Sequence, residues 1–356
     1  MKAFLWCLLL GLSPGYFTDG FGQPDLPRQY ICYRTTGSVS IDGELHEADW
    51  KLAPFSLEFA DIEGMHKPEP YHRTRVKIMW DDSYLYIGAY LQENHLWATY
   101  TQRESVIFHE NDFEVFIDPD GDTHQYLELE INALGTIWDL KLPKPYRDGG
   151  SADSEWNFEG LKSAVALQGT LNNPDDLDSG WTIELAIPWD AMKEYAHQQK
   201  MPEPGETWRI NFSRVQWDLL VRNGEYVKKK DPVTGKNLPE RNWVWSPQGV
   251  VNMHRPETWG FIQFSAQTVK NQNTGFNEKN DYSHQQVLRE LYYWQKENLK
   301  KHGKYLALEK NGAPFKSELA DKVEIKINNE SYQMTIVSPN RSWHIREDGK
   351  IWSTPL

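Results

Sequence analysis

The chain is poor in cysteine, in long apolar runs and in positive charge, and each shortage excludes a class of protein. Only two of the 356 residues are cysteine, Cys7 and Cys32, which is too few for a disulfide-stabilised scaffold. The apolar run near the N-terminus, Ala3–Leu12, is too short to span a bilayer. Lys and Arg number 38 against 51 Asp and Glu, a net charge of −13, which argues against a nucleic-acid or anionic-membrane partner.

The N-terminus has the pattern of a secretory signal peptide. Lys2 precedes the apolar run, and Gly20-Phe21-Gly22 places small residues before a cleavage point at Gln23. Cys7 lies inside the run rather than at its end, which disfavours a lipid anchor; an uncleaved membrane anchor is the alternative. We therefore expect a secreted or periplasmic protein with no membrane span after the signal is removed.

Aromatic residues are abundant, with 16 Trp, 17 Tyr and 14 Phe. This frequency indicates aromatic side chains with a role beyond filling a core. Six tryptophans lie within core-type motifs, where packing is the expected role: Trp50, Trp80, Trp181, Trp189, Trp208 and Trp259.

The region from residue 39 to residue 265 is patterned as short β-strands. Seven segments show period-two or continuous apolar character: Thr74–Trp80, Tyr84–Leu91, Asp112–Asp118, Gln125–Ile131, Trp181–Ile187, Trp208–Val215 and Trp259–Phe264. Polar turns such as Asp81-Asp82-Ser83 separate them, and neither βαβ alternation nor a Gly-rich phosphate loop is present. This pattern predicts an all-β protein, an antiparallel β-sandwich.

The pattern changes near residue 266. Residues 266–356 carry 14 Lys and Arg against 11 Asp and Glu, and apolar residues at helical spacing predict a helix over 285–301. Three strand-like segments follow: Val323–Ile327, Tyr332–Val337 and Trp343–Trp352, the last folded at Asp348-Gly349. We expect a small C-terminal α+β appendage that docks on the sandwich, with docking on a partner protein as the alternative.

These patterns divide the chain into five parts. They are a signal peptide at 1–22, an N-terminal segment at 23–37, the sandwich at 38–265, a polar linker at 266–280 and a helix-plus-strand region at 281–356.

Several motifs follow one another in an order typical of a known family. Ile41-Asp42-Gly43-Glu44 and WDDSYLYIGAYL are followed by NDFEVFIDPDGD, LELEINALGT, GWTIELAIPW and GETWRINFSR, and the series closes with HRPETWGFIQF. Over residues 38–265 the chain thus resembles the family 9 carbohydrate-binding modules. The resemblance implies a DOMON-like sandwich that binds sugar, and it does not extend to the tail.

A sugar ring presents an apolar face and a rim of hydroxyls, so it requires aromatic rings and polar side chains. Alternation places Asp112 and Glu114 on one face of their strand, and Glu128, Glu130 and Asn132 on one face of the next. The expected carbohydrate-binding residues are Phe108, Asp112, Glu114, Glu130, Asn132, Trp138, Arg214 and His254. A solvated sheet face with ordinary carboxylates is the simpler alternative.

The chain departs from the family's founding members at the sugar clamp. Their two clamping tryptophans are replaced here by Phe108 or His109 and by Met253-His254, and an arginine beside the sheet asparagine is replaced by Glu130. The candidate replacements in nearby loops or strand ends are Trp138, Trp156, Arg214, Trp243 and Trp245.

Other chemistries have weaker support. Asp118, Asp120 and Asp122 offer alternating oxygen ligands for a structural calcium, although an acidic β-turn is the commoner explanation of such a run. The chain contains no HExxH motif, so the sequence does not indicate a catalytic zinc. The resemblance to DOMON-like sandwiches, some of which bind haem, leaves a haem held by Met79, Met253 or His254 as a further alternative.

Paired carboxylates, Glu114 with Glu130 or Glu128 with Glu184, make a glycoside hydrolase another alternative. The sequence favours glycan binding without catalysis, in the service of polysaccharide breakdown or uptake. No cofactor is required, and a hydrolase is the expected partner protein.

Overall fold

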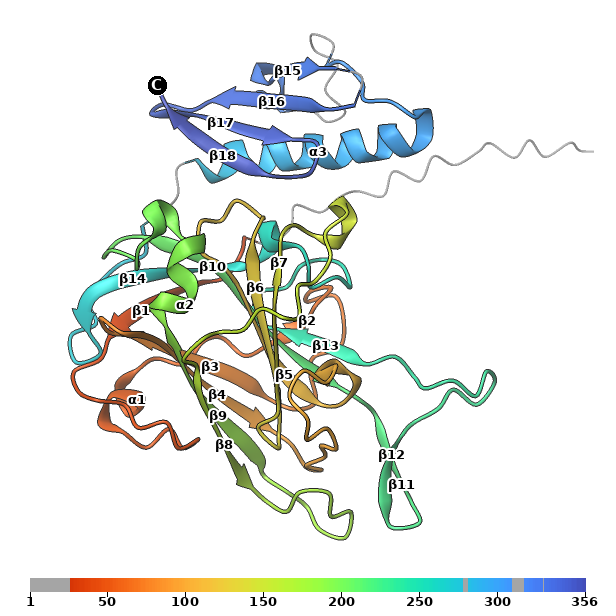
Figure 1. Ribbon diagram of the computed structural model, residues 1–356. Helices are drawn as coiled ribbons and strands as arrows, with labels where there is room; N and C mark the ends of the chain where they lie inside the picture. The colour runs from red at the N-terminus through yellow and green to blue at the C-terminus, as the bar shows by residue number, and fades with distance from the viewer. Residues whose placement is uncertain (1–25, 278–280, 309–316, 329) are drawn as a thin grey trace, which may run out of the picture.

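The computed structural model describes residues 26–277, 281–308, 317–328 and 330–356 (Figure 1). The predicted signal peptide therefore lies outside the described residues. Within them, no helix is both long and apolar enough to cross a membrane.

One curled sheet forms most of the molecule, with the strands in the order β7-β6-β5-β10-β14-β1-β3-β4-β9-β8. Their bounds are β1 Gln29–Arg34, β3 Thr74–Trp80, β4 Tyr84–Gln92, β5 Asp112–Asp118, β6 Tyr126–Asn132, β7 Ile137–Leu142, β8 Lys162–Gln168, β9 Gly180–Pro188, β10 Thr207–Gln216 and β14 Gly260–Thr268. Off this path, β13 (Arg241–Val244) pairs with β10 and with β2 (Ala60–Asp61), and β11 (Leu219–Arg222) forms a separate hairpin with β12 (Glu225–Lys228). Two short helices, α1 (Ala48–Leu52) and α2 (Trp189–Met192), accompany the strands.

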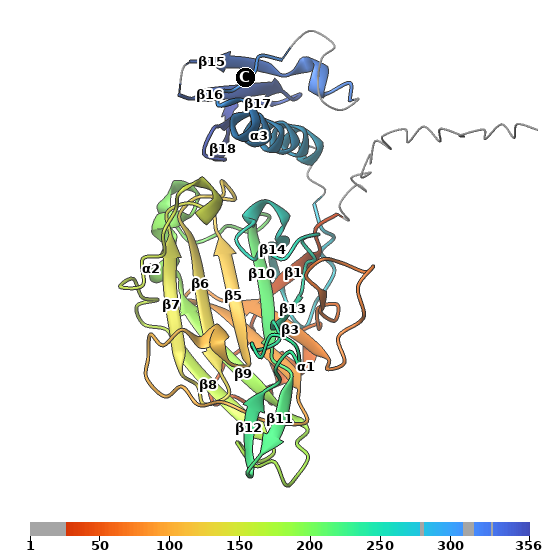
Figure 2. The same cartoon turned by 90° about the vertical axis from the view of Figure 1, so that its right-hand side faces the viewer.

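The curl of the sheet brings its two halves face to face, as Figure 2 shows for β5, β6, β7 and β10 in front of β8 and β9. Apolar side chains of β5 and β6, such as Val115 and Leu129, share one buried core with those of β3 and β9, such as Ile78 and Leu185. The six tryptophans assigned to packing are all buried, which confirms that prediction. The fold is the expected β-sandwich.

The sheet is not wholly antiparallel, because β1 runs parallel to both of its neighbours, β14 and β3. The predicted N-terminal segment at 23–37 therefore contributes a strand to the sandwich rather than preceding it. The sequence pattern also missed the strands β7 and β8. Whether such short segments form strands depends on their packing against residues that are distant in the sequence.

The tail folds as predicted, with a helix on one face of an antiparallel sheet. α3 (Tyr282–His302) packs against the four-stranded sheet of β15 (Glu324–Ile327), β16 (Tyr332–Val337), β17 (Arg341–Arg346) and β18 (Ile351–Pro355). Leu288 and Leu291 of the helix form a core with Met334, Ile336 and Ile345 of the sheet. Gly303, with φ of 68°, ends the helix in the left-handed conformation that glycine adopts at low cost.

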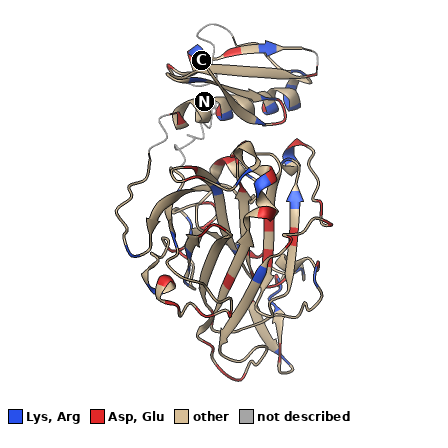
Figure 3. Ribbon diagram, turned by 60° about the vertical axis from the view of Figure 1, so that its left-hand side comes forward, with Lys and Arg blue, Asp and Glu red and all other residues tan. Residues whose placement is uncertain are grey.

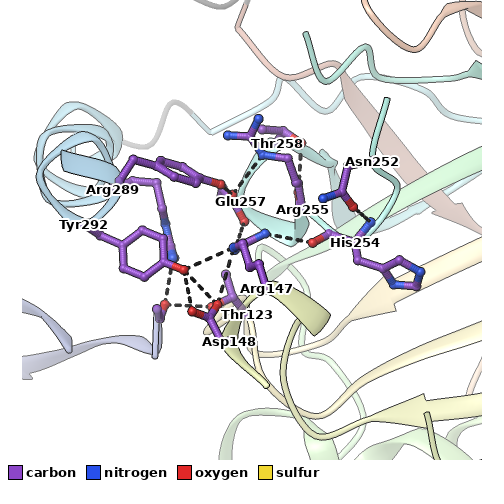
Figure 4. A network of polar contacts seen from close by, with 12 residues as sticks. Thr123, Arg147, Asp148, Asn252, His254, Arg255, Glu257, Thr258, Arg289 and Tyr292 are labelled. Atoms are coloured by element: carbon purple, nitrogen blue, oxygen red, sulfur yellow. Dashed lines mark hydrogen bonds and ion pairs between the residues drawn. The ribbon is translucent and has the colours of Figure 1, made fainter. Parts of the chain in front are cut away.

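The tail docks on the sandwich through ion pairs and hydrogen bonds (Figure 4). Arg147 donates to the Tyr292 hydroxyl of the tail at 3.2 Å, and Lys296 of the tail pairs with Asp148 at 2.7 Å. Within the sandwich, Arg147 also donates to Glu257 at 2.9 Å. The 3-10 turn η2 (Tyr146–Asp148) supplies Arg147 and Asp148, while Tyr292 and Lys296 belong to α3.

A second contact brings the tail's last hairpin onto the acidic loop of the sandwich. Lys350 pairs with Asp122 at 2.7 Å, and Thr123 donates to the Gly349 carbonyl at 2.9 Å. In Figure 3 several basic residues follow α3, whereas acidic residues mark the strands of the sandwich. At this contact, lysines of the tail pair with aspartates of the sandwich, in keeping with the opposite net charges of the two parts.

Candidate functional site

Four carboxylates gather on the outer face of β5 and β6. Glu114 lies directly opposite Glu130, while Asp112 lies opposite Asn132 and Phe116 opposite Glu128, so these side chains share a face. Asp112, Glu114, Glu128 and Glu130 are only 0%, 4%, 4% and 1% exposed. Oxygens of Asp112, Glu114 and Glu130 lie within 4.8 Å of one another. The sheet therefore holds a compact acidic floor, which we call the carboxylate floor.

Burial is the main reason why the carboxylate floor resists ionisation. It raises the pKa of Glu114 to about 7 and raises the pKa values of Asp112, Glu128 and Glu130 well above normal, with mutual repulsion adding to the effect for those three. In the described part of the chain none of the four forms an ion pair. One oxygen of Asp112, Glu114 and Glu128 is buried with no hydrogen-bond partner among the described residues.

Two aromatic rings lie beside the floor. Phe108, in the turn η1 (Ile107–His109), and Trp138, on β7 opposite Glu130, are stacked with 6.2 Å between ring centroids and 28° between planes. The Phe108 amide donates to Glu130 at 2.9 Å, and its carbonyl accepts from the Trp217 indole at 3.1 Å. Both stacked rings are half-buried. The hydrogen bond from the Phe108 amide thus holds the stacked pair of rings next to the carboxylate of Glu130.

A second aromatic group lies at the tail side of the floor. The rings of Tyr146 and His254 meet edge to face at 4.5 Å, and His254 Nδ1 lies 3.0 Å from the Tyr126 hydroxyl. Burial, aided by the charge of Arg147, lowers the pKa of His254 to about 4, so the imidazole is neutral at pH 7. Burial and the charges of Glu128 and Glu130 raise the pKa of Tyr146, a ring that remains 48% exposed.

The structure brings most of the predicted site residues together. Phe108, Asp112, Glu114, Glu130 and Trp138 form one group, and His254 lies next to it through Tyr146.

Asn132 and Arg214 do not join this group. The amide of Asn132 donates to Glu110 and to the Tyr100 carbonyl and accepts from the amides of Leu134 and Thr136, so its hydrogen-bonding capacity is fully used within the fold.

Arg214 points to the opposite side of the sheet. It lies across from Phe113, a core residue, and its guanidinium pairs with Glu93 at 2.9 Å and donates to the Gln92 carbonyl at 2.7 Å. The period of a strand explains this placement, because Arg214 and the neighbouring floor-side residue Ser213 must point in opposite directions.

The other candidate tryptophans are also packing residues. Trp243 and Trp245 are buried in the sandwich core, and Trp156 packs against its edge beside Phe158. Sequence reasoning missed two members of the site, Glu128 and Tyr146. The alternation of β6 already placed Glu128 beside Glu130, whereas the loop residue Tyr146 carried no signal.

The acidic loop after β5 is organised as a turn. Asp118 accepts from the amides of Gly121 and Thr123, and Asp122 accepts from His124 and pairs with Lys350. Oxygens of Asp118, Asp120 and Asp122 nevertheless lie within 4.8 Å of one another, so a calcium at this loop stays a prediction.

The structure does not bring together the residues of two alternatives, the catalytic pair of Glu128 with Glu184 and the haem site. Glu184 accepts from the Trp50 indole at 2.5 Å and from the Gly43 amide at 2.8 Å, a structural role on a different strand from Glu128. Met79 and Met253 belong to separate apolar clusters, so the two sulfurs do not face a common haem site.

A comparison with protein families identifies the region that carries the site. Residues 41–203 match the model of the family described as "Carbohydrate family 9 binding domain-like". This region is similar to family 9 carbohydrate-binding domains. The match contains the whole carboxylate floor and both stacked rings, and it confirms the family that the motifs indicated. It ends before β10 and therefore before Arg214 and His254.

Curated relatives of this region include two large enzymes. The chain is 32% identical over 178 residues to endo-1,4-beta-xylanase A of Thermoanaerobacterium saccharolyticum and 32% identical over 117 residues to exoglucanase XynX of Acetivibrio thermocellus. These matches cover 50% and 33% of the chain but only 12% and 9% of the relatives, so the chain spans about a tenth of their length.

Among solved structures, a family 9 carbohydrate-binding module from Caldicellulosiruptor kristjanssonii in complex with cellotriose is similar at a TM-score of 0.43 and 16% identity. That similarity covers 70% of this chain and 100% of the module.

Proposed function

We propose that the chain binds a carbohydrate at the outer face of β5, β6 and β7 and does not cleave it. One observation carries this proposal: the stacked rings of Phe108 and Trp138 are joined to the carboxylate floor through the hydrogen bond from Phe108 to Glu130. Rings supply the flat apolar contact and carboxylate oxygens accept hydroxyl hydrogen bonds, the two requirements of a sugar.

The family 9 match supports binding as the function of this region. Similar regions occur in two proteins named as a xylanase and an exoglucanase, which supports a role beside polysaccharide-cleaving enzymes. We extend this to the present chain as a role in polysaccharide breakdown or uptake, outside the cytoplasm and alongside a hydrolase.

Absence of catalysis is part of the proposal, and burial supports it. Hydrolysis requires two carboxyl groups on either side of one glycosidic bond, with different protonation states. Here the neighbouring carboxyl groups share one buried face, and all of their pKa values are raised in the same direction. Because the pKa values of all these carboxyl groups are raised, their environments do not assign one of them as the proton donor and another as the ionised nucleophile.

Calorimetry with glucose, cello-oligosaccharides and xylo-oligosaccharides tests the proposal. We expect dissociation constants between micromolar and millimolar, roughly −4 to −8 kcal/mol. Trp138→Ala should weaken binding about 10-fold or more, because it removes one face of the ring pair. Trp352→Ala is the matched control, since Trp352 is also half-buried but lies on β18 of the tail.

Equal loss of binding in the two variants, or no binding by the wild type to any glycan of a wide panel, would reject the site. Sustained release of reducing sugar that disappears in Glu114→Gln would instead establish a hydrolase.

A further inference from the structure

We propose that the glycan bound at the stacked rings of Phe108 and Trp138 carries a negatively charged group, and that Lys228 binds this group. The group would be the carboxylate of a uronic acid or a sulfate ester, on a sugar next to the one that lies on the rings. The inference names the ligand class of the proposed site and therefore rests on the proposed function.

Lys228 belongs to a basic segment that leaves the sandwich after β10. Residues 219–240, which we call the basic arm, contain the β11–β12 hairpin and carry five Lys and Arg against three Asp and Glu, in a chain with a net charge of −13. Both Figure 1 and Figure 2 show the hairpin projecting beyond the end of β10. The basic arm lies outside residues 41–203, so the family match does not account for it.

A row of contacts connects Lys228 to the proposed glycan site. The Lys228 ammonium lies 3.4 Å from the centroid of the Trp217 ring, and the Trp217 indole donates to the Phe108 carbonyl at 3.1 Å. Phe108 in turn stacks on Trp138. A glycan chain that extends from the two rings towards Trp217 would therefore reach the ammonium of Lys228.

Lys228 differs from an ordinary surface lysine. Lys229 and Lys230 are exposed, and lysines of this kind keep the edge of a hairpin from pairing with other chains. Lys228 is half-buried instead, and burial lowers its pKa although the charge of Glu240 opposes this. Among the described residues its ammonium has neither an ion pair nor a hydrogen bond. An anionic ligand would supply the missing partner and offset the cost of burial.

The charges around the site give a bound glycan one orientation. A negative group above the carboxylate floor would be repelled by each of the four acids that is ionised, whereas Lys228 and the two lysines that follow it would attract the same group. Opposite charges at the two ends of a site favour one orientation of a charged ligand over the reverse. We therefore expect a neutral sugar on the rings and the charged sugar beside the basic arm.

Calorimetry on the full chain compares three probes: xylotetraose, xylotetraose with one glucuronic acid and xylotetraose with one sulfate ester. We expect at least one charged probe to bind about 10-fold more tightly than the neutral probe, the effect of one hydrogen bond to a charged group. This gain should shrink when the salt rises from about 0.05 M to about 0.5 M, because salt screens the attraction. The probe that shows the larger gain identifies the anion.

Variants locate the source of the gain. Lys228→Gln should remove it, so that charged and neutral probes bind alike, whereas Lys228→Arg should keep most of it because the cation remains. Lys162→Gln is the matched control, since Lys162 also lies over a ring, that of Tyr84 at 4.7 Å, but on β8 and β4 in the other half of the curled sheet. It should show the same gain as the wild type. Thermal melting checks that each variant is folded.

Equal affinity of the wild type for all three probes would overturn the inference and leave the proposed function intact. A gain that persists in Lys228→Gln, or that Lys162→Gln loses to the same extent, would also overturn it, because the attraction would then come from the charge of the whole chain. Tight binding of a charged probe that depends on Lys228 but not on Trp138 would support the anion site and reject the proposed function of the rings.

Discussion

The contact between the tail and the sandwich leads to a testable prediction about Arg147, which binds two groups of the sandwich and one of the tail. Arg147 donates to Glu257 at 2.9 Å, to the His254 carbonyl at 2.8 Å and to the Tyr292 hydroxyl at 3.2 Å. Arg147→Ala removes all three bonds. It also frees the segment that carries His254 and the turn that carries Tyr146, both of which border the candidate site.

The magnitude follows from burial. Loss of one partner of a buried ion pair costs about 3–5 kcal/mol when the remaining charge has no other partner. The side chain of Glu257 is 8% exposed but keeps Arg255 at 3.4 Å and a hydrogen bond from Tyr293. We therefore expect the sandwich to lose at most about 3 kcal/mol of stability. Undocking of the tail is favoured only by loss of the Arg147–Tyr292 hydrogen bond, worth about 1.5 kcal/mol, which raises the undocked fraction of the tail roughly 10-fold.

Limited proteolysis measures this fraction directly. Cleavage in the polar linker after β14 should accelerate in Arg147→Ala, and glycan affinity should fall as Tyr146 and His254 lose their support. Arg73→Ala is the matched control, because Arg73 pairs with Glu58 where both side chains are about half exposed, so its loss should cost at most about 1 kcal/mol. Identical cleavage rates and melting temperatures in the two variants would refute this account of docking.

Three further predictions concern residues around the sandwich. Asn132→Ala should destabilise the fold by about 3 kcal/mol in urea unfolding, because it leaves the amides of Leu134 and Thr136 without an acceptor and removes one donor to Glu110; a change below about 1 kcal/mol would contradict the role given to it here. Gly43→Ala should lower the melting temperature, because φ is +90° and an added Cβ would lie 2.6 Å from the Val165 carbonyl carbon; an unchanged temperature would show that the backbone can move there. Burial alone would raise the pKa of Glu93, but a hydrogen bond from His72 and the charge of Arg214 lower it to about 2. The unfolded chain therefore binds the extra proton, so this stabilisation is complete above about pH 4.5 and is lost as the pH falls towards 2, by about 3 kcal/mol in total. Urea unfolding at pH 5 and pH 3 should show a smaller difference between wild type and Glu93→Gln at the lower pH, and an equal difference would disprove the assignment.

Local patterns were sufficient for much of the fold. Period-two alternation predicted the bounds of β3 and β5 correctly, and helical spacing placed α3 to within three residues at its start and one at its end. Weak or very short patterns such as those of β1 and β8 were missed, because their identity as strands depends on neighbours supplied by distant parts of the chain.

The candidate site shows the same division. Alternation alone placed Asp112 and Glu114 on one face, and Glu128 with Glu130 on one face of the next strand, because successive side chains of a strand point to opposite sides. That same rule separates Arg214 from the floor once the register of β10 against β5 is known, and the register is a tertiary fact.

The sequence by itself determined most of the long strands, their polar faces and the resemblance to a family, since each of these depends on residue spacing along the chain. Only the tertiary structure decided which polar face is covered by aromatic rings and which part of the chain supplies them. The Tyr126–His254 contact joins residues 128 positions apart. Such contacts arise from the closing of the sheet and the packing of loops, which depend on the whole chain rather than on any local pattern.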